Sequence, residues 1–128
     1  MNDETKARCR ALMAGLAKGA EVSSAVHDTA IVETSWPWGA LSAAALPRFW
    51  TDFCRAFPDA VRREVIAGAG DNHPDPRYQG QRPPHLVASI GTYQATFSAP
   101  FLGLPATGQV IHLRFADAFW IEDEKLRW

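Results

Sequence analysis

Residues 101–122 read FLGLPATGQVIHLRFADAFWIE and contain the clearest structural signals of the chain. The first eight, 101–108, are rich in glycine and proline, which favours turns over helix or strand. From Gln109 to Glu122 the side chains alternate between two sets, as they do along a strand with two different faces. We therefore predict a strand over 109–122, a turn at 123–124 and a last strand over 125–128. One face of the long strand carries an aspartate within an apolar row: Ile111, Leu113, Phe115, Asp117, Phe119 and Ile121.

The segments before this strand predict two more strands of the same sheet. Residues 86–97 form a second long strand pattern, and residues 60–67 form a shorter one whose apolar members are Val61, Val65 and Ile66. Glycine, proline, aspartate and asparagine recur throughout 68–84. A stretch of this composition leaves little scope for regular structure, so we expect an irregular loop over 68–84.

The first half of the chain predicts mainly helices. Residues 4–18 have an amphipathic helical pattern, a short helical turn is expected at 24–28, and β-branched residues favour a short strand over 29–34. A further helix is expected over 42–56, because apolar residues recur there at helical spacing: Leu46, Phe49, Trp50, Phe53, Cys54 and Phe57. Helices followed by successive strands predict an α+β fold with the helices on one face of an antiparallel sheet.

Length and composition limit the classes of function. A chain of 128 residues suits one domain, here over 1–128, and 47% hydrophobic with 21% charged residues is ordinary for a globular protein. The formal net charge of −1 and the lack of a basic run argue against nucleic acid or an anionic membrane surface as partner. No apolar run has the length of a membrane span or the form of a secretory signal. We expect a cytoplasmic protein in which Cys9 and Cys54 are reduced core thiols.

Two segments resemble the SnoaL-like polyketide cyclases, a family of the nuclear transport factor 2-like superfamily. The first is Phe49-Trp50 followed by Ala56-Phe57-Pro58-Asp59 and a strand, which resembles the third helix of these domains and the step into their sheet. The second runs from Gly91-Thr92-Tyr93 through 101–108 to Trp120-Ile121-Glu122-Asp123. Its most specific part is Gly103-x-Pro105-x-Thr107-Gly108. Together the matched stretches cover roughly the last two thirds of the chain, and the N-terminal helices fit by order alone.

The resemblance implies a curved antiparallel sheet forming a cone, three N-terminal helices that close it, and an apolar cavity between helices and sheet. Characterised members cyclise polyketide esters through an aldol-type step without metal or nucleotide, so the resemblance implies no cofactor. Membership of a fold does not by itself imply that reaction.

The chain departs from the family pattern at three places. Tyr93 stands where the family often has histidine, and Glu124 stands where a glycine is expected in the last turn. The family's aspartate in a terminal "hWD" sequence would fall beyond Trp128. We therefore expect either a final strand that is cut short, as in one half of a longer two-domain protein, or a domain that does not use that acid.

Asp117 is the strongest candidate for catalysis, because a carboxylate in an apolar row is costly unless paired and burial raises its pKa. Such a group suits a general acid or base acting on a carbonyl compound. The alternatives are a structural aspartate held by a serine, tyrosine or arginine, or a bulge that turns Asp117 outwards. Tyr93 is the second candidate, as a hydrogen-bond donor to a substrate oxygen; the alternative is a packing tyrosine with a satisfied hydroxyl.

Aromatic residues are expected to line the cavity, although helical spacing also makes Trp50 a core residue. Trp36 and Trp38 bracket Pro37 in a loop and suit a pocket mouth or a dimer contact. The four histidines show no spacing typical of metal ligands, so no metal site is expected. The full set of expected pocket-lining residues is Trp36, Trp38, Phe49, Trp50, Phe53, Phe115 and Phe119.

Three functional hypotheses follow. The first is a cofactor-independent enzyme, a cyclase or isomerase that acts on a small apolar carbonyl compound through Asp117 and Tyr93. The second is a non-catalytic module that holds an apolar ligand. The third is a homodimer scaffold whose contact surface includes the outward row His112, Arg114 and Trp120.

Overall fold

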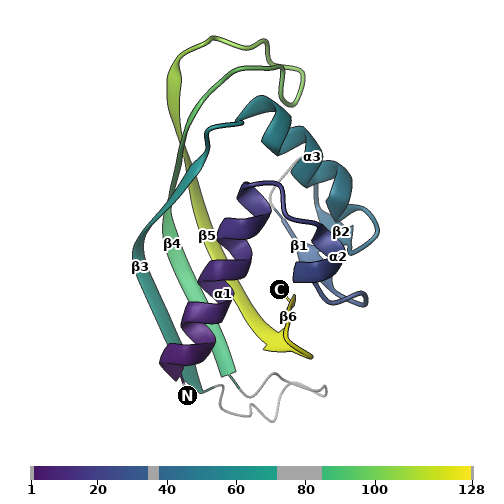
Figure 1. Ribbon diagram of the computed structural model, residues 1–128, viewed down its shortest axis with the longest axis vertical. Coiled ribbons are helices and arrows are strands. Elements are labelled where there is room, and N and C mark those ends of the chain that lie inside the picture. Colours follow the sequence, from purple (N-terminus) through teal and green to yellow (C-terminus); the bar gives the residue numbers. More distant parts are fainter. Residues whose placement is uncertain (1, 35–37, 72–84, 128) are drawn as a thin grey trace.

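The computed structural model describes residues 2–34, 38–71 and 85–127. These residues form an α+β fold, as predicted (Figure 1). Four strands form one antiparallel sheet in the order β3-β4-β5-β6, and two short strands, β1 and β2, form an antiparallel pair. In chain order the elements are α1 (Asn2–Ala17), α2 (Val22–Ala25), β1 (Ile31–Glu33), β2 (Ala40–Ser42), α3 (Leu46–Ala56), β3 (Val61–Asp71), β4 (His85–Thr96), β5 (Val110–Glu122) and β6 (Lys125–Arg127).

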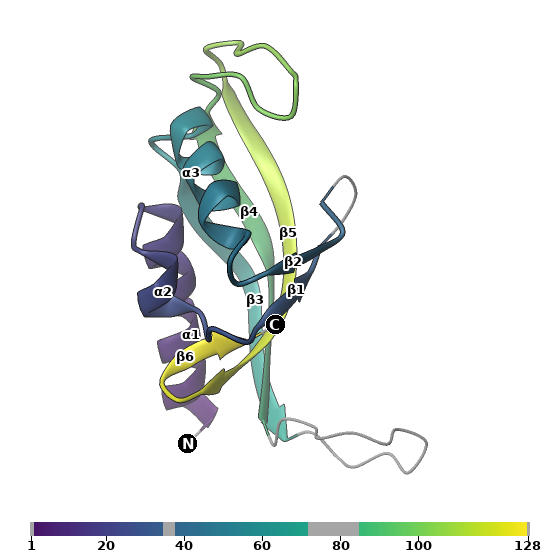
Figure 2. The ribbon, with the colours of Figure 1, turned by 90° about the vertical axis from the view of Figure 1, so that its right-hand side faces the viewer.

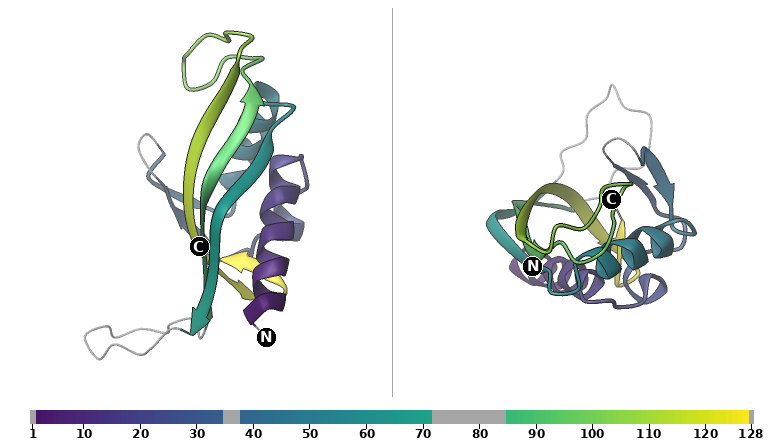
Figure 3. Two further views of the ribbon diagram at one scale, coloured as in Figure 1. Left: turned by 90° about the vertical axis from the view of Figure 1, so that its left-hand side faces the viewer. Right: turned by 90° about the horizontal axis from the view of Figure 1, so that it is seen from above.

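The helices all lie on one side of the β3–β5 sheet. The strands curve along their length, with α1 and α3 against one face and no described helix against the other (Figures 2 and 3). An isolated bridge between Val26 and Leu126 ties the segment after α2 to β6. None of the helices in the described residues is long and apolar enough to cross a membrane. The result is a helix layer on an antiparallel sheet, with the core between them.

The core is built from the apolar faces that the sequence indicates. Helix α1 buries Cys9, Met13 and Leu16, and α3 buries Leu46, Trp50 and Phe53 against the sheet. Cys9 and Cys54 are both free, and burial raises the pKa of the Cys9 thiol to about 11. This core thiol is therefore protonated and unreactive at neutral pH.

Two helix boundaries differ from the prediction. The long helix begins at Leu46 instead of 42, with Pro47 in its first turn, where the missing amide costs no helical hydrogen bond. Ala40–Ser42 forms strand β2 instead, because these residues pair with β1. The short helix α2 spans Val22–Ala25 and thus lies earlier than the expected turn at 24–28. Local propensity is too weak to fix such boundaries against tertiary pairing.

The expected loop over 68–84 is wrong for its first residues, because β3 continues to Asp71. Gly68 and Gly70 pair with Ala88 and Leu86 of β4 despite the low strand propensity of glycine. A neighbouring strand that supplies hydrogen bonds can override intrinsic preference. Residues 72–84 lie outside the described residues.

A β-bulge in β3 decides which of its side chains face the helices. Glu64 pairs with Gly91 and Ile66 with Ile90, so Val65 is the extra residue. Before the bulge, Arg62 and Glu64 share the helix-facing side with Tyr93; Val65 and Ile66 lie exposed on the other side. Two charged residues of this strand, Arg62 and Glu64, therefore face the helices, whereas the apolar Val65 and Ile66 face outward.

The predicted turn at 123–124 joins β5 to β6 and has an unusual backbone. Asp123 and Glu124 have φ angles of 51° and 64°, in the left-handed region. A two-residue hairpin of the type I′ class requires positive φ at both central residues, which glycine adopts most easily. This explains why glycine is the residue expected at the position of Glu124.

Gly91 is required by close packing where β4 crosses the bulge. A Cβ added there would lie 2.0 Å from the carbonyl oxygen of Arg63 and 2.8 Å from Cζ of Phe115.

We predict that Gly91→Ala lowers the free energy of unfolding by at least about 2 kcal/mol, because the backbone must move to relieve this clash. Gly68→Ala in β3 is the matched control: its Cβ would meet no atom within 4 Å, so its effect should stay within about 1 kcal/mol. Chemical denaturation measures both, and equal effects would contradict the packing argument.

Candidate functional site

A buried arginine on β3 connects three strands on the helix-facing side of the sheet. Arg62 Nη1 donates a hydrogen bond of 2.8 Å to the Tyr93 hydroxyl on β4. Its Nη2 donates to Ser89 Oγ at 2.8 Å and to Asp117 Oδ2, on β5, at 2.9 Å. Only 3% of the Arg62 side chain is exposed, compared with 18% for Asp117. We call Arg62, Ser89, Tyr93 and Asp117 the arginine cluster.

Strand register brings these residues together. Arg62 lies directly opposite Tyr93, and Ser89 lies opposite Asp117, so all four side chains point to the same face. The guanidinium carbon of Arg62 also lies 3.7 Å from the ring centre of Phe115, a cation–π contact. That ring occupies the space next to Gly91, where any Cβ would collide with it.

A second carboxylate, Glu64, lies on the other side of the guanidinium. Arg62 Nε is 3.6 Å from Glu64 Oε1, and Arg10 of α1 forms an ion pair with Glu64 Oε2. Only 7% of the Glu64 side chain is exposed. The contact with Arg10 occupies Glu64 Oε2, whereas Glu64 Oε1 and Arg62 Nε have no hydrogen-bond partner within the described structure. Unsatisfied buried polar atoms are rare in proteins and call for an explanation.

Burial sets the protonation of the cluster. It raises the pKa of the Asp117 carboxyl, an effect that the neighbouring Arg62 cation only partly opposes. Burial also raises the pKa of the Tyr93 hydroxyl, again against Arg62. Tyr93 is therefore neutral at physiological pH, and because its oxygen accepts the Arg62 hydrogen bond, its proton can be donated elsewhere. A carboxyl with a raised pKa next to a neutral donor can exchange protons with a bound molecule.

A groove of about 360 Å³ lies between α1 and β3 and reaches Arg62 and Glu64. The helix side of this α1–β3 groove consists of Ala7, Arg10, Ala11 and Ala14, so its wall is mostly methyl groups. The groove thus combines an apolar wall with two buried, oppositely charged groups.

The two predicted catalytic residues come together, and the residue that joins them was not predicted. Asp117 faces inward, so the alternative of a bulge that turns it out is wrong; it is held by an arginine, as the structural alternative supposed. The catalytic role of Asp117 and Tyr93 remains a prediction. Arg62 and Glu64 were missed because they belong to a run of three charges, Arg62-Arg63-Glu64, that shows no alternation; pairing with β4 places Arg62 and Glu64 on the inner face and leaves Arg63 exposed.

Among the described residues, the predicted pocket-lining side chains lie in different surroundings. Trp50 and Phe119 are buried core residues, and Phe115 lies under Arg62. Trp38 and Phe49 line a separate hollow of about 70 Å³ beside Phe101. Phe53 is buried between this hollow and the arginine cluster. Its ring centre lies 5.1 Å from the ring centre of Tyr93 and 6.3 Å from that of Phe101. Trp36 lies outside the described residues.

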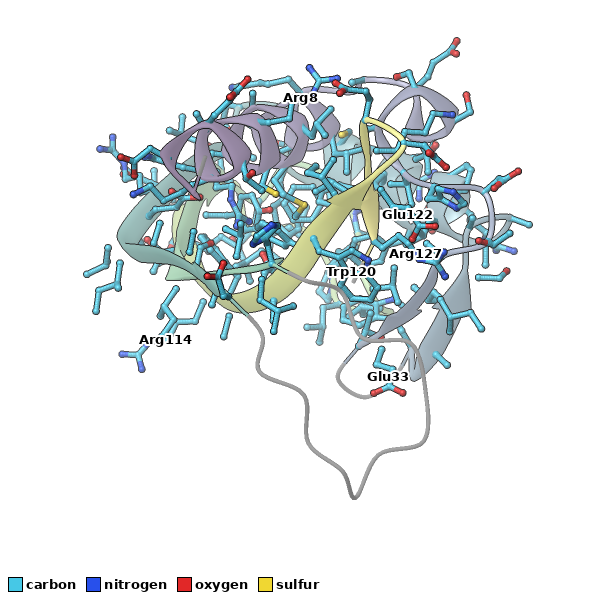
Figure 4. All side chains as sticks on the ribbon, turned by 90° about the horizontal axis from the view of Figure 1, so that it is seen from below. Arg8, Glu33, Arg114, Trp120, Glu122 and Arg127 are labelled. Carbon is cyan, nitrogen blue, oxygen red and sulfur yellow. The ribbon has the colours of Figure 1, made fainter. Side chains whose placement is uncertain are left out.

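One group of side chains in the described chain has the composition of a metal site. His27, Glu122 and Asp123 offer ligand atoms within 4.8 Å of one another near the β5–β6 turn. Sequence spacing could not reveal them, because they are about ninety-five residues apart. Asp123 is 82% exposed and His27 Nδ1 already contacts the Thr29 hydroxyl at 2.9 Å, so an ordinary surface ion-pair cluster accounts for the group. Next to it, Arg127 lies beside Glu122 and Trp120 (Figure 4).

Solved structures with the same fold are known, although no protein-family model and no curated protein matches the sequence. AclR of Streptomyces galilaeus, a candidate hydroxylase, has a TM-score of 0.73 and 20% identity over 98% of this chain and 75% of its own. IdmH of Streptomyces antibioticus, a candidate polyketide cyclase, has a TM-score of 0.66 and 14% identity over 94% of this chain and 86% of its own. A candidate SnoaL-like polyketide cyclase from Jannaschia sp. CCS1 has a TM-score of 0.65 and 13% identity, over 95% and 82%. The SnoaL-like fold indicated by the sequence resemblance is thereby confirmed.

Proposed function

Starting from the SnoaL-like fold, we propose that this chain is a cofactor-independent enzyme that moves protons on a small apolar carbonyl compound. The reaction would be of the polyketide cyclase or isomerase kind. We also propose that residues 1–128 form a single domain in which the curved sheet and three helices make the cone of the nuclear transport factor 2-like superfamily. The observation that carries the functional proposal is the buried arginine cluster, in which Arg62 holds Asp117 and Tyr93.

The proposed chemistry assigns one role to each residue. Asp117 removes a proton from the carbon next to the carbonyl group, and Tyr93 donates a hydrogen bond to the oxygen on which negative charge develops. Asp117 then returns the proton to a carbon or oxygen of the product, so no oxidant or metal takes part in the balance. Arg62 is a positioning residue: it fixes the orientation of both groups and offsets the charge of the ionised carboxylate.

The polar groups support this assignment because stability alone does not require them. A buried ion pair is often no more stabilising than apolar residues of the same volume. Asp117 nevertheless retains 18% side-chain exposure, so it is not sealed from solvent. Candidate cyclases among the similar structures are consistent with such chemistry but, at their low identity, support the fold alone.

Proton abstraction can be measured as exchange of the methyl protons of acetophenone with deuterium oxide, followed by nuclear magnetic resonance (NMR). We expect Asp117→Asn to slow the catalysed exchange by about 10²–10⁴-fold and Tyr93→Phe by about tenfold. Asp3→Asn, at a side chain that is 95% exposed, is the matched control and should have no effect. Exchange by Asp117→Asn at the wild-type rate would exclude Asp117 as the base.

The same assay has an expected pH dependence. The base acts in its ionised form, so the rate should fall as the pH is lowered through the pKa of Asp117. Since burial raises that pKa, the midpoint should lie above the ordinary aspartate value of about 3.9. Ligand binding without any exchange would instead favour the non-catalytic module.

The outer face of the sheet favours a second role, homodimer formation. Val65, Ile66 and Ile90 are 77%, 63% and 54% exposed and lie together where β3 pairs with β4. Contiguous exposed apolar surface is unusual on a monomer, and one self-complementary patch suits a twofold dimer. Arg114 points away from the body of the molecule on this face (Figure 4), next to Thr92 in the register.

Dimer formation through this face predicts that Ile90→Lys shifts the protein from dimer to monomer, because it places a charge in the buried contact. Sedimentation velocity of the purified chain measures the change in mass. The matched control is Ile31→Lys: Ile31 is 62% exposed but lies on β1, away from this sheet. A wild-type monomer, or a dimer that survives Ile90→Lys, would contradict the proposed interface.

A further inference from the structure

The α1–β3 groove ends on hydrogen-bonding groups that the protein itself leaves unused. Glu64 and Arg62 both line it, and their side chains are 7% and 3% exposed. Glu64 Oε2 is taken by the ion pair with Arg10, but Glu64 Oε1 and Arg62 Nε lack hydrogen-bond partners among the described residues. The arginine cluster uses only Nη1 and Nη2 of Arg62, so this edge of the guanidinium is independent of Asp117 and Tyr93.

The spacing of these atoms defines the group that would satisfy them. Arg62 Nε and Glu64 Oε1 are 3.6 Å apart, which is too long for a hydrogen bond between them. Both atoms are buried, so a ligand oxygen reaches them only when the two side chains move slightly apart. A hydroxyl about 2.8 Å from each can then accept from Nε and donate to the carboxylate at once. An ether or carbonyl oxygen cannot donate and would leave Glu64 unsatisfied.

The charges around the groove indicate a neutral ligand. Arg10 and Arg62 contribute two positive charges, and Glu64 and Asp117 contribute two negative ones. An anion would face Glu64 and a cation would face two arginines, so neither gains from the site as a whole. The methyl groups of Ala7, Ala11 and Ala14 supply apolar contact that bulk water cannot replace.

We propose that the α1–β3 groove is a binding site for a neutral small molecule with an apolar body and a hydroxyl group, which bridges Arg62 Nε and Glu64. This site goes beyond the proton transfer proposed for Asp117, because binding here requires no turnover. The alanines keep the groove open, and a larger side chain at Ala11 would fill it.

The test compares 4-hydroxyacetophenone with its methyl ether, 4-methoxyacetophenone, in which a methyl group replaces the hydroxyl proton. Binding is followed by NMR shifts of backbone amides, which also locate the site. We expect the hydroxyl probe to shift the amides of Ala7, Ala11 and Ala14 and to bind at least about tenfold more tightly than the ether, since a hydrogen bond to a charged group is lost.

Three variants test whether the probes bind in the α1–β3 groove. Glu64→Gln should weaken the hydroxyl probe at least about tenfold, and Ala11→Leu should abolish binding of both probes. The matched control Glu4→Gln makes the same chemical change on the exposed start of α1 and should leave binding unchanged. Because Ala11 is exposed and leucine is a good helix former, Ala11→Leu keeps the test valid even if Glu64→Gln fails to fold.

Three results would overturn the site: no binding of the hydroxyl probe at millimolar concentration, equal affinity for both probes, or binding that Ala11→Leu leaves intact. The outcome is separate from that of the catalytic proposal. Hydroxyl-dependent binding without deuterium exchange supports the groove and refutes the enzyme. Deuterium exchange without binding of the hydroxyl probe supports the enzyme and refutes the groove.

Discussion

The buried guanidinium of Arg62 is the constraint on which the interior of this protein depends. A cation that is only 3% exposed must be compensated, and here two carboxylates, a hydroxyl and a phenol surround it. Removing one partner from such a group typically costs about 3–5 kcal/mol, because the remaining charge stays buried. Arg62 therefore ties β3, β4 and β5 together at one point, and the bulge and Gly91 are the backbone features that make room for it.

The fold could be predicted because its signals are local. The apolar stripe of α3, the alternation in β5 and the turn residues at 101–108 each report on their own segment. The strand bounds of β3 could not be predicted, because Gly68 and Gly70 are held by pairing with β4, a contact that the local sequence does not contain.

Only two of the charged and polar residues of the candidate site, Asp117 and Tyr93, could be predicted from the sequence. Asp117 stands out because it interrupts an apolar row, and Tyr93 because it stands where the resembled family often has histidine. Arg62 and Glu64 belong to a run of three charges, Arg62-Arg63-Glu64, and such a run is ordinarily assigned to solvent. Pairing with β4 places Arg62 and Glu64 on the inner face, and after the bulge Ile66 lies exposed on the outer one. Positions where burial contradicts sequence pattern are often functional, and here the contradiction leads to the arginine cluster and the groove.

The central claim is that Asp117 is buried against Arg62 and carries a perturbed proton affinity. The most direct measurement is an NMR titration of the Asp117 side-chain carboxyl in the wild type and in Arg62→Met. The account predicts a wild-type pKa above the ordinary aspartate value of about 3.9, and a still higher one in Arg62→Met, because the variant loses the cation but keeps the burial. An ordinary pKa in both proteins would show that Asp117 is solvated and independent of Arg62, and would contradict the account.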